Sequence, residues 1–344
     1  MRGLAIATTW LDVRSAILLL TIGVIGSTAA RAECLDGRGG TRLAEQRPGR
    51  LEITMTPSAR VSRDLALAGD ALVWTSGQDV WRLPDGGRGC LEHIAALPRP
   101  AQPTISSRLA VGGEALVEVT QTTVRELGQA RIPIALPETP LASLVHDGAL
   151  YTTVFRGDAI YRIDLATGQL GTFATLPAQS GRFGLVLAQH GDSLYVASYG
   201  QRWLAELPFA TGTMRTIARG FATGPTALAV DGTNAYVYLE SSRRSTGSLQ
   251  RVVLATGKAR ALATNLINSD GVLLDDGWLY LRTAAGRRVD LVRVPADGSG
   301  GVELVERELP AGSRPVAADA EAIYLDAAGQ VIRLEKSQLV TRTR

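Results

Sequence analysis

Short apolar runs separated by turn residues recur along most of the chain, and no segment beyond the N-terminal region shows the 3.6-residue apolar period of an amphipathic helix. Residues 143–176 are representative. There the turn Asp147-Gly148 precedes an apolar run through Tyr151, and residues 161–165 then alternate between apolar and polar side chains. Runs of about four to eight residues bounded by Gly, Asp, Asn or Pro are typical of strands. The pattern predicts an all-β chain of short antiparallel strands.

The pattern repeats with a nearly constant period. The position of Tyr151 is one of seven equivalent anchor positions, which are Val73, Val117, Tyr151, Tyr195, Tyr236, Tyr280 and Tyr324, at intervals of 44, 34, 44, 41, 44 and 44 residues. A second series of turn glycines advances in step with the anchors and comprises Gly86, Gly168, Gly212, Gly257 and Gly298. Four strands in a period of roughly 40–45 residues are typical of a propeller blade. We therefore predict a seven-bladed β-propeller of four-stranded antiparallel blades.

The sequence predicts three regions along the chain. Residues 1–32 have the features of a signal peptide, with basic Arg2 and Arg14, an apolar run over residues 15–26 and a small-residue cleavage site ending at Ala32. The apolar run is shorter than the roughly 20 residues of a membrane-spanning helix, although an uncleaved anchor is the alternative. Residues 33–50 are predicted to be a linker, and residues 51–344 a single propeller domain.

The ring needs one more strand to complete its last blade. Residues 51–56 alternate like a strand and lie upstream of the first blade, so we expect them to pair beside residues 331–334 and close the ring. Closure of this kind removes an exposed sheet edge. The alternative is that residues 338–341 supply that strand.

Two of the repeats carry a resemblance to a known family. Residues 192–218 contain Ser-Leu-Tyr-Val-Ala-Ser followed by Ala-Glu-Leu-Pro-Phe-Ala-Thr-Gly, and residues 143–176 have a similar pattern. Both stretches resemble YVTN-type β-propeller repeats, and the resemblance extends over roughly residues 65–334. That family and its relatives include binding modules, assembly factors and a few enzymes. The resemblance implies the fold and transfers no site residue.

The net charge and the two cysteines bear on the expected partners and the cellular location of the chain. The formal net charge is +3, and removal of residues 1–32 takes away three Arg and one Asp, so the exported chain is nearly neutral. Nucleic acid is therefore not an expected partner, and no stable membrane insertion is expected after cleavage. The two cysteines, Cys34 and Cys90, both follow the cleavage site, which predicts a disulfide in an oxidising periplasmic or secreted location. Two free thiols are the alternative.

One candidate site lies five residues before each anchor. Five consecutive repeats place an ionisable residue there, namely His146, His190, Asp231, Asp275 and Asp319. Imidazole and carboxylate groups are ligands for divalent metals, so one interpretation is a metal near the central opening. The other is turn chemistry, because Asp before Gly favours tight turns by itself. No resident cofactor is predicted, with a divalent metal left as the alternative.

A second candidate site lies at the opposite ends of the strands. The connections between second and third strands are rich in arginine, carrying Arg156, Arg202, Arg243, Arg244, Arg282, Arg287 and Arg288. Because Arg can grip carboxylate or phosphate with two hydrogen bonds, these loops predict contact with a cell-envelope or extracellular protein, or with an anionic glycan. The alternative is an Arg-rich solvated rim.

We therefore expect an exported binding or scaffolding protein that acts without chemistry. The competing hypothesis is a metal-assisted enzyme, a lyase or lactonase-like hydrolase, that would use His146, His190 and Asp231 near the channel.

Overall fold

The protein is described here from a computed structural model. The structure describes residues 42–47, 50–54, 65–76, 79–84, 92–96, 108–113, 115–120, 122–128, 133–155, 158–177, 184–241, 246–267, 271–285, 288–327 and 330–339. The predicted signal peptide, Cys34 and Cys90 lie outside these residues. Among the described residues, no helix is both long and apolar enough to span a bilayer.

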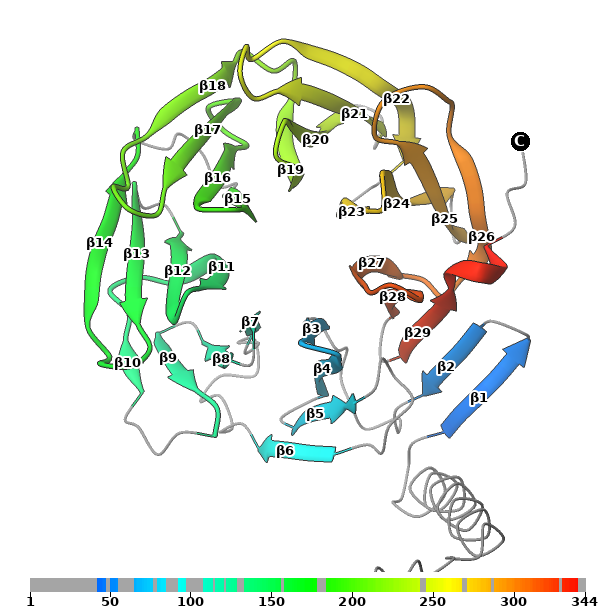
Figure 1. The fold of residues 1–344 in the computed structure, drawn as a ribbon, viewed down its shortest axis with the longest axis horizontal. Helices are drawn as coiled ribbons and strands as arrows, with labels where there is room; N and C mark the ends of the chain where they lie inside the picture. Colours follow the sequence, from blue (N-terminus) through cyan, green and yellow to red (C-terminus); the bar gives the residue numbers. More distant parts are fainter. Residues whose placement is uncertain are drawn as a thin grey trace, which may run out of the picture.

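Seven antiparallel sheets form a closed ring, which confirms the predicted seven-bladed β-propeller (Figure 1). Blade 1 contains β3 (Ala66–Ala68), β4 (Ala71–Ser76), β5 (Asp79–Leu83) and β6 (Glu92–Ala96). Blade 2 contains β7 (Arg108–Gly112), β8 (Ala115–Val119), β9 (Thr123–Glu126) and β10 (Ile134–Ala135). Blade 3 contains β11 (Pro140–His146), β12 (Ala149–Val154), β13 (Ala159–Asp164) and β14 (Leu170–Thr175). Blade 4 contains β15 (Leu185–His190), β16 (Ser193–Ser198), β17 (Trp203–Pro208) and β18 (Arg215–Arg219).

The remaining three blades complete the ring. Blade 5 contains β19 (Gly224–Val230), β20 (Asn234–Ser241), β21 (Thr246–Val253) and β22 (Ala259–Ile267). Blade 6 contains β23 (Leu273–Asp275), β24 (Trp278–Ala285), β25 (Arg288–Pro295) and β26 (Glu303–Leu309). Blade 7 contains β27 (Arg314–Ala318), β28 (Ala322–Ala327) and β29 (Gln330–Glu335), followed by the 3-10 helix η1 (Lys336–Gln338).

The N-terminal part of the described chain closes the ring. Strand β2 (Arg50–Thr54) pairs with β29 along its whole length, with Leu51 opposite Arg333 and Ile53 opposite Val331, as the first of the two sequence alternatives predicted. Of the other alternative, residues 338–341, the described part is residue 338, which ends η1, and residue 339, and neither lies in a strand. Strand β1 (Arg42–Arg47) adds a fifth strand outside β2, within the segment predicted to be a linker (Figure 1).

Both faces of each sheet are covered by the neighbouring blades. The second strand of a blade is almost wholly enclosed, and in β12 and β28 every residue is buried. Apolar side chains from adjacent blades form shared clusters, such as Trp74 and Leu72 of blade 1 with Tyr324 of blade 7. Because each cluster joins two blades, the hydrophobic core is a ring of interfaces between blades and not one central core.

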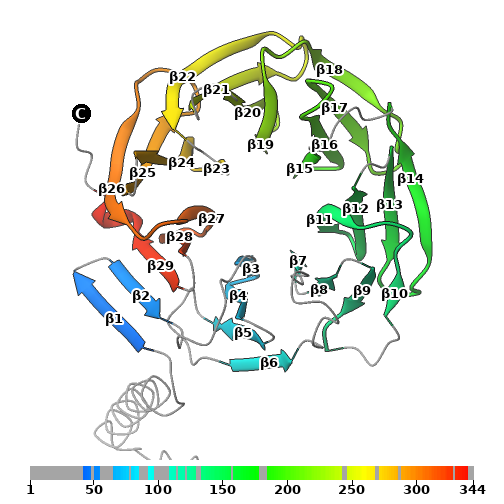
Figure 2. The same cartoon turned by 180° about the vertical axis from the view of Figure 1, so that it is seen from behind.

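Consecutive antiparallel strands alternate in direction, which places different connections on the two faces of the ring, seen from opposite sides in Figures 1 and 2. We call the turn face the one that carries the turns between first and second strands, such as Asp231-Gly232, and between third and fourth strands, such as Thr256-Gly257. The loop face carries the connections between second and third strands, such as residues 199–202, and the connections between blades.

Candidate functional site

The carboxylates predicted as metal ligands on the turn face are engaged in turn hydrogen bonds in two blades. In blade 5, Asp231 Oδ1 accepts the backbone N–H groups of Thr233 and Asn234 at 2.7 and 2.6 Å, and Oδ2 accepts the anchor hydroxyl of Tyr236 at 2.6 Å. Blade 7 repeats this arrangement. Both oxygens of each carboxylate therefore serve the turn and the anchor.

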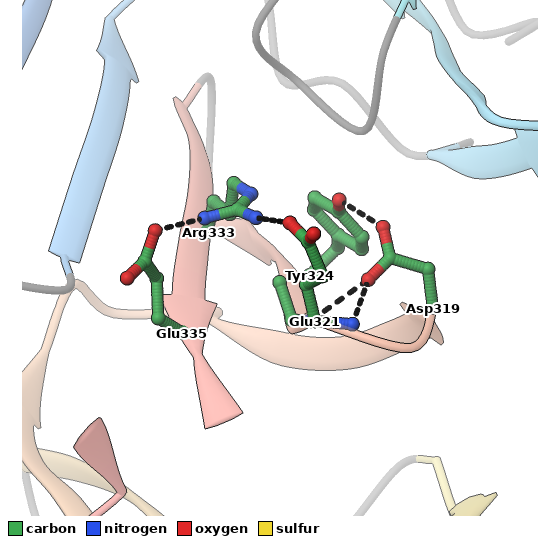
Figure 3. A network of polar contacts seen from close by, with 6 residues as sticks. Asp319, Glu321, Tyr324, Arg333 and Glu335 are labelled. Atoms are coloured by element: carbon green, nitrogen blue, oxygen red, sulfur yellow. Dashed lines mark hydrogen bonds and ion pairs between the residues drawn. The ribbon is translucent and has the colours of Figure 1, made fainter. Parts of the chain in front are cut away.

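Figure 3 shows the blade 7 version as part of a larger network. Asp319 accepts the backbone N–H groups of Glu321 and Ala322 through Oδ1 and the hydroxyl of Tyr324 through Oδ2 at 2.5 Å. Tyr324 lies opposite Arg333 in the sheet, and the buried Arg333 guanidinium donates to Glu335 and Glu321. The network ties the second and third strands of blade 7 to the first turn.

The same cross-strand pairing occurs in all seven blades. Each anchor lies opposite a charged residue of the third strand, giving the pairs Val73 with Arg82, Val117 with Glu126, Tyr151 with Arg162, Tyr195 with Glu206, Tyr236 with Arg251, Tyr280 with Arg293, and Tyr324 with Arg333. The sequence repeat located the anchors but not these partners. In the sequence, these partners can be recognised as an Arg or Glu at the third-strand position that the antiparallel register places opposite each anchor.

These hydrogen bonds lower the pKa values of the turn carboxylates Asp319 and Asp231. Partial burial by itself would raise the pKa of Asp319, but hydrogen bonds from Tyr324 and from two backbone amides outweigh burial and hold that pKa below its ordinary value. Asp231 behaves in the same way, with its pKa lowered by Tyr236 and the turn amides against the effect of burial. Burial, and after it the Asp319 carboxylate, raises the pKa of Tyr324, which therefore remains a donor.

We expect Tyr324→Phe to lower the free energy of unfolding by about 1 kcal/mol at pH 7, because one hydrogen bond to a partly exposed carboxylate is lost. A carboxylate whose folded pKa is depressed contributes stability above its unfolded pKa, and that contribution is lost as pH falls through the folded pKa. The deficit of the variant should therefore shrink in acid. Urea denaturation at pH 7 and at about pH 3 measures it, with Tyr236→Phe as an internal repeat in blade 5. Equal deficits at both pH values would contradict the assignment.

The other three predicted metal ligands also have protein contacts. His146 stacks on Phe209 of blade 4 with ring centroids 3.9 Å apart, and its Nδ1 lies 2.6 Å from the side-chain nitrogen of Gln189. The ring nitrogen of His190 lies against Gly232 of blade 5. Asp275 forms an ion pair with Lys336 at 2.5 Å. Within the described residues, no three His, Cys, Asp or Glu side chains group closely enough to hold a metal ion.

Several of these contacts cross from one blade to the next. His146 joins blades 3 and 4, His190 lies against blade 5, and Lys336, which follows blade 7, reaches blade 6. Arg251 of blade 5 likewise donates to the Asp297 carbonyl of blade 6 at 2.8 Å. On the turn face, therefore, polar side chains chiefly hold the blades in register.

The arginines predicted on the loop face are only partly described. Arg156, Arg243, Arg244 and Arg287 lie outside the described residues, and Arg288 begins β25 without a described side chain. Arg202 is exposed in the connection between β16 and β17, and Arg282 is half-buried near the loop-face end of β24. Two described members of the predicted set thus lie on the predicted face.

A feature that the sequence analysis missed distinguishes the loop face. Nine polar or charged residues are buried within the described parts of the chain, and seven of them lie on the loop-face half of a second strand or just before β27: Thr75, Glu118, Thr152, Thr153, Ser198, Ser313 and Asp326. Two of the seven are in ion pairs, Glu118 with Arg125 at 2.9 Å and Asp326 with Arg314 at 3.2 Å. The inner strands are apolar toward the turn face and polar toward the loop face.

Buried polar groups cost free energy unless they are hydrogen-bonded, and Thr152, Thr153, Ser198 and Ser313 have hydrogen bonds within the chain. Their concentration at one end of the innermost strands resembles a binding site, which combines packed walls with a few placed polar groups. The signal in the sequence was a polar residue one to three positions after the anchor, as in Glu118, Thr153, Ser198 and Asp326.

Comparison with known proteins identifies the architecture only. No known protein family and no curated protein matches the sequence. Among solved structures, the chain is similar to the extracellular domain of a hybrid two component system from B. thetaiotaomicron, with 14% identity, a TM-score of 0.59 and coverage of 81% of this chain but only 38% of that one.

Two further solved structures are similar to this chain at equally low sequence identity. A computationally designed protein matches with 11% identity and a TM-score of 0.56, over 80% of this chain and 96% of that one. A chain of the Mitotic Checkpoint Complex matches with 10% identity and a TM-score of 0.57, over 80% and 90%. At such identities the likeness establishes the propeller fold alone, because one fold can host many functions.

Proposed function

We propose that this protein is an exported binding module that contacts an acidic partner through the loop face of its propeller. The observation that carries the proposal is the distribution of buried polar residues, seven of nine within the described residues lying toward the loop face. A closed ring of packed blades is a rigid support, and loops on a rigid support commonly carry recognition.

The charge of the loops indicates the chemistry of the partner. Arg202 and Arg282 lie in or near second-to-third-strand connections on this face, and the sequence predicts the same position for Arg243, Arg244, Arg287 and Arg288. Guanidinium groups match carboxylates and phosphates in geometry and charge. A cell-envelope or extracellular protein, or an anionic glycan, would present such groups in the periplasm or outside the cell, where the predicted signal peptide would deliver the chain.

The described residues of the turn face give no support to a metal-assisted enzyme. The carboxylates of Asp231 and Asp319 are taken up by turn amides and anchor hydroxyls, and His146 is stacked on Phe209. Nothing among the described residues favours catalysis over binding.

Reversing four loop-face charges tests the proposal. We expect the variant Arg243→Glu, Arg244→Glu, Arg287→Glu, Arg288→Glu to lose capture of its partner from cell-envelope extracts, because attraction becomes repulsion across the interface. The matched control is Lys258→Glu with Arg260→Glu, two exposed cations on the turn face of blade 5. Capture compared by affinity purification and mass spectrometry should be unchanged in the control. Undiminished capture by the four-residue variant would refute the proposal.

A further inference from the structure

We propose that the exposed guanidinium groups of Arg202 and Arg219, at the outer corner of blade 4 on the loop face, bind carboxylates on the surface of a folded protein partner. This inference rests on the proposed function and narrows it to one contact point and one class of partner.

The backbone of the Arg202 turn is fixed by buried partners. Its N–H donates to the Ser198 carbonyl at 2.9 Å, and its carbonyl accepts the N–H of Phe221 at 3.2 Å. The hydroxyl of Ser198, which is fully buried, accepts the N–H of Gln201 at 3.1 Å. The long side chain of Arg202 therefore projects from an ordered turn.

The same turn holds Arg202 in an unfavourable conformation. Its φ is 55°, in the left-handed region that costs an L-residue roughly 1–2 kcal/mol and that glycine adopts freely. Strain of this kind in a non-glycine residue is often found at functional sites. An exposed arginine at a position suited to glycine is better explained by recognition than by folding.

A second exposed arginine lies near Arg202 along the backbone of blade 4. Arg219 is exposed and lies opposite Trp203, the residue after Arg202, in the ladder between β17 and β18. Its described side-chain bond is to the hydroxyl of Thr216, at 3.2 Å. Neither Arg202 nor Arg219 forms an ion pair with a carboxylate of the described chain. Seven other described arginines each have one, namely Arg50, Arg125, Arg162, Arg215, Arg293, Arg314 and Arg333. Two exposed cations at the same end of blade 4, neither paired with a carboxylate of the described chain, are open to external anions.

The surroundings favour a protein over a sugar polymer or a free anion. Arg202 and Arg219 are exposed on a corner, where a broad partner surface can reach both. Sugar binding commonly uses exposed aromatic faces, but Trp203 is buried and the Tyr199 ring packs against Gly224 of blade 5. On blade 6, Arg293 covers the Trp278 ring at 4.0 Å. Arginine at the rim of a protein interface fits this setting.

The test uses the full chain with three probes: immobilised poly-L-glutamate, immobilised heparin and inorganic phosphate as competitor. At about 50 mM salt, where screening is weak, we expect Arg202→Glu with Arg219→Glu to weaken binding to poly-L-glutamate by about tenfold or more. The turn-face control, Lys258→Glu with Arg260→Glu, should change it less than twofold. Equal losses in the two variants, or no loss in the first, would overturn the proposal.

The other outcomes assign the source of the anion and separate recognition from folding. If binding to heparin is stronger and depends on Arg202 and Arg219, the partner is a glycan and not a protein. If millimolar phosphate displaces the bound chain, the ligand is a small anion and not a protein. Arg202→Gly removes the guanidinium and relieves the left-handed strain, so it should unfold at the same or a higher temperature and yet bind more weakly. Unchanged binding by this variant would contradict a role for the side chain.

This inference and the proposed function can fail separately. If the four-residue variant at Arg243, Arg244, Arg287 and Arg288 loses capture while the Arg202 and Arg219 variant keeps it, the loop face binds a partner but blade 4 is not the contact point. If both variants retain capture, the proposed function fails as well.

Discussion

Replacement of Gly257 by alanine is expected to lower the free energy of unfolding by about 3 kcal/mol, whereas the same replacement at Gly168 should cost about 1 kcal/mol. The two glycines occupy equivalent Ala-Thr-Gly turns, with φ of 67° and 76°. Each donates its N–H to the carbonyl four residues earlier, Val253 at 2.8 Å and Asp164 at 2.7 Å. An alanine therefore meets the same left-handed backbone cost, roughly 1–2 kcal/mol, at both positions.

The neighbouring blade makes the difference between these positions. A Cβ at 257 would overlap the backbone carbonyl oxygen of Ile217 in blade 4, which cannot rotate away. A Cβ at 168 would lie 3.6 Å from the side chain of Ile134, an ordinary contact. Overpacking against a fixed neighbour costs typically about 1–3 kcal/mol, which is added only at Gly257.

Urea denaturation of the two variants beside the parent protein measures this difference directly. Gly212 provides a repeat, since a Cβ there would meet the Phe173 carbonyl oxygen of blade 3, and Gly212→Ala should behave like Gly257→Ala. Equal losses at Gly168 and Gly257 would mean that the turn conformation alone requires glycine and that close approach of the blades does not matter.

Removal of the closing strand β2 should destabilise the propeller by at least 3–5 kcal/mol. Without β2, the edge of β29 is exposed along the register from Gln330 to Leu334, which invites pairing with other chains. The Arg50 guanidinium also disappears from its ion pair with Glu306 of blade 6, at 3.2 Å between side chains that are 12% and 8% exposed. Breaking a buried ion pair by removing one partner costs about 3–5 kcal/mol by itself.

Two shortened chains isolate the role of β2. A chain that begins at residue 55 lacks β1 and β2, and a chain that begins at residue 49 lacks only β1. Both lack Cys34, so any contribution of the predicted disulfide cancels between them. We expect the shorter chain to unfold at a markedly lower temperature and to aggregate, as measured by thermal unfolding and size-exclusion chromatography. If the two chains unfold alike, β2 does not close the ring energetically.

The ring architecture could be derived from the sequence because it depends on local signals. Tight turns at Asp147-Gly148 and at the Ala-Thr-Gly motifs, strand-length apolar runs and a period near 44 residues each reflect backbone preferences that are written within one blade. The closing role of residues 51–54 also followed, because six blades had an outer strand upstream of the next blade and one strand was left over. Strand β1 did not follow, since its composition resembles a linker and its pairing depends on β2.

The candidate site depended on the tertiary structure because its members are partners across strands and between blades. Sequence alone placed His146, Asp231 and Asp319 in equivalent turns, but only the packed ring shows that Phe209 stacks on His146 and that Tyr236 and Tyr324 occupy the carboxylates. The chain determined its own repeat, its turns and its closing strand through local backbone chemistry. Packing between blades decided which polar groups support the structure and which, like Arg202 and Arg219, remain exposed. Burial and hydrogen bonding depend on neighbours that are distant in the sequence, so the sequence alone could not give them.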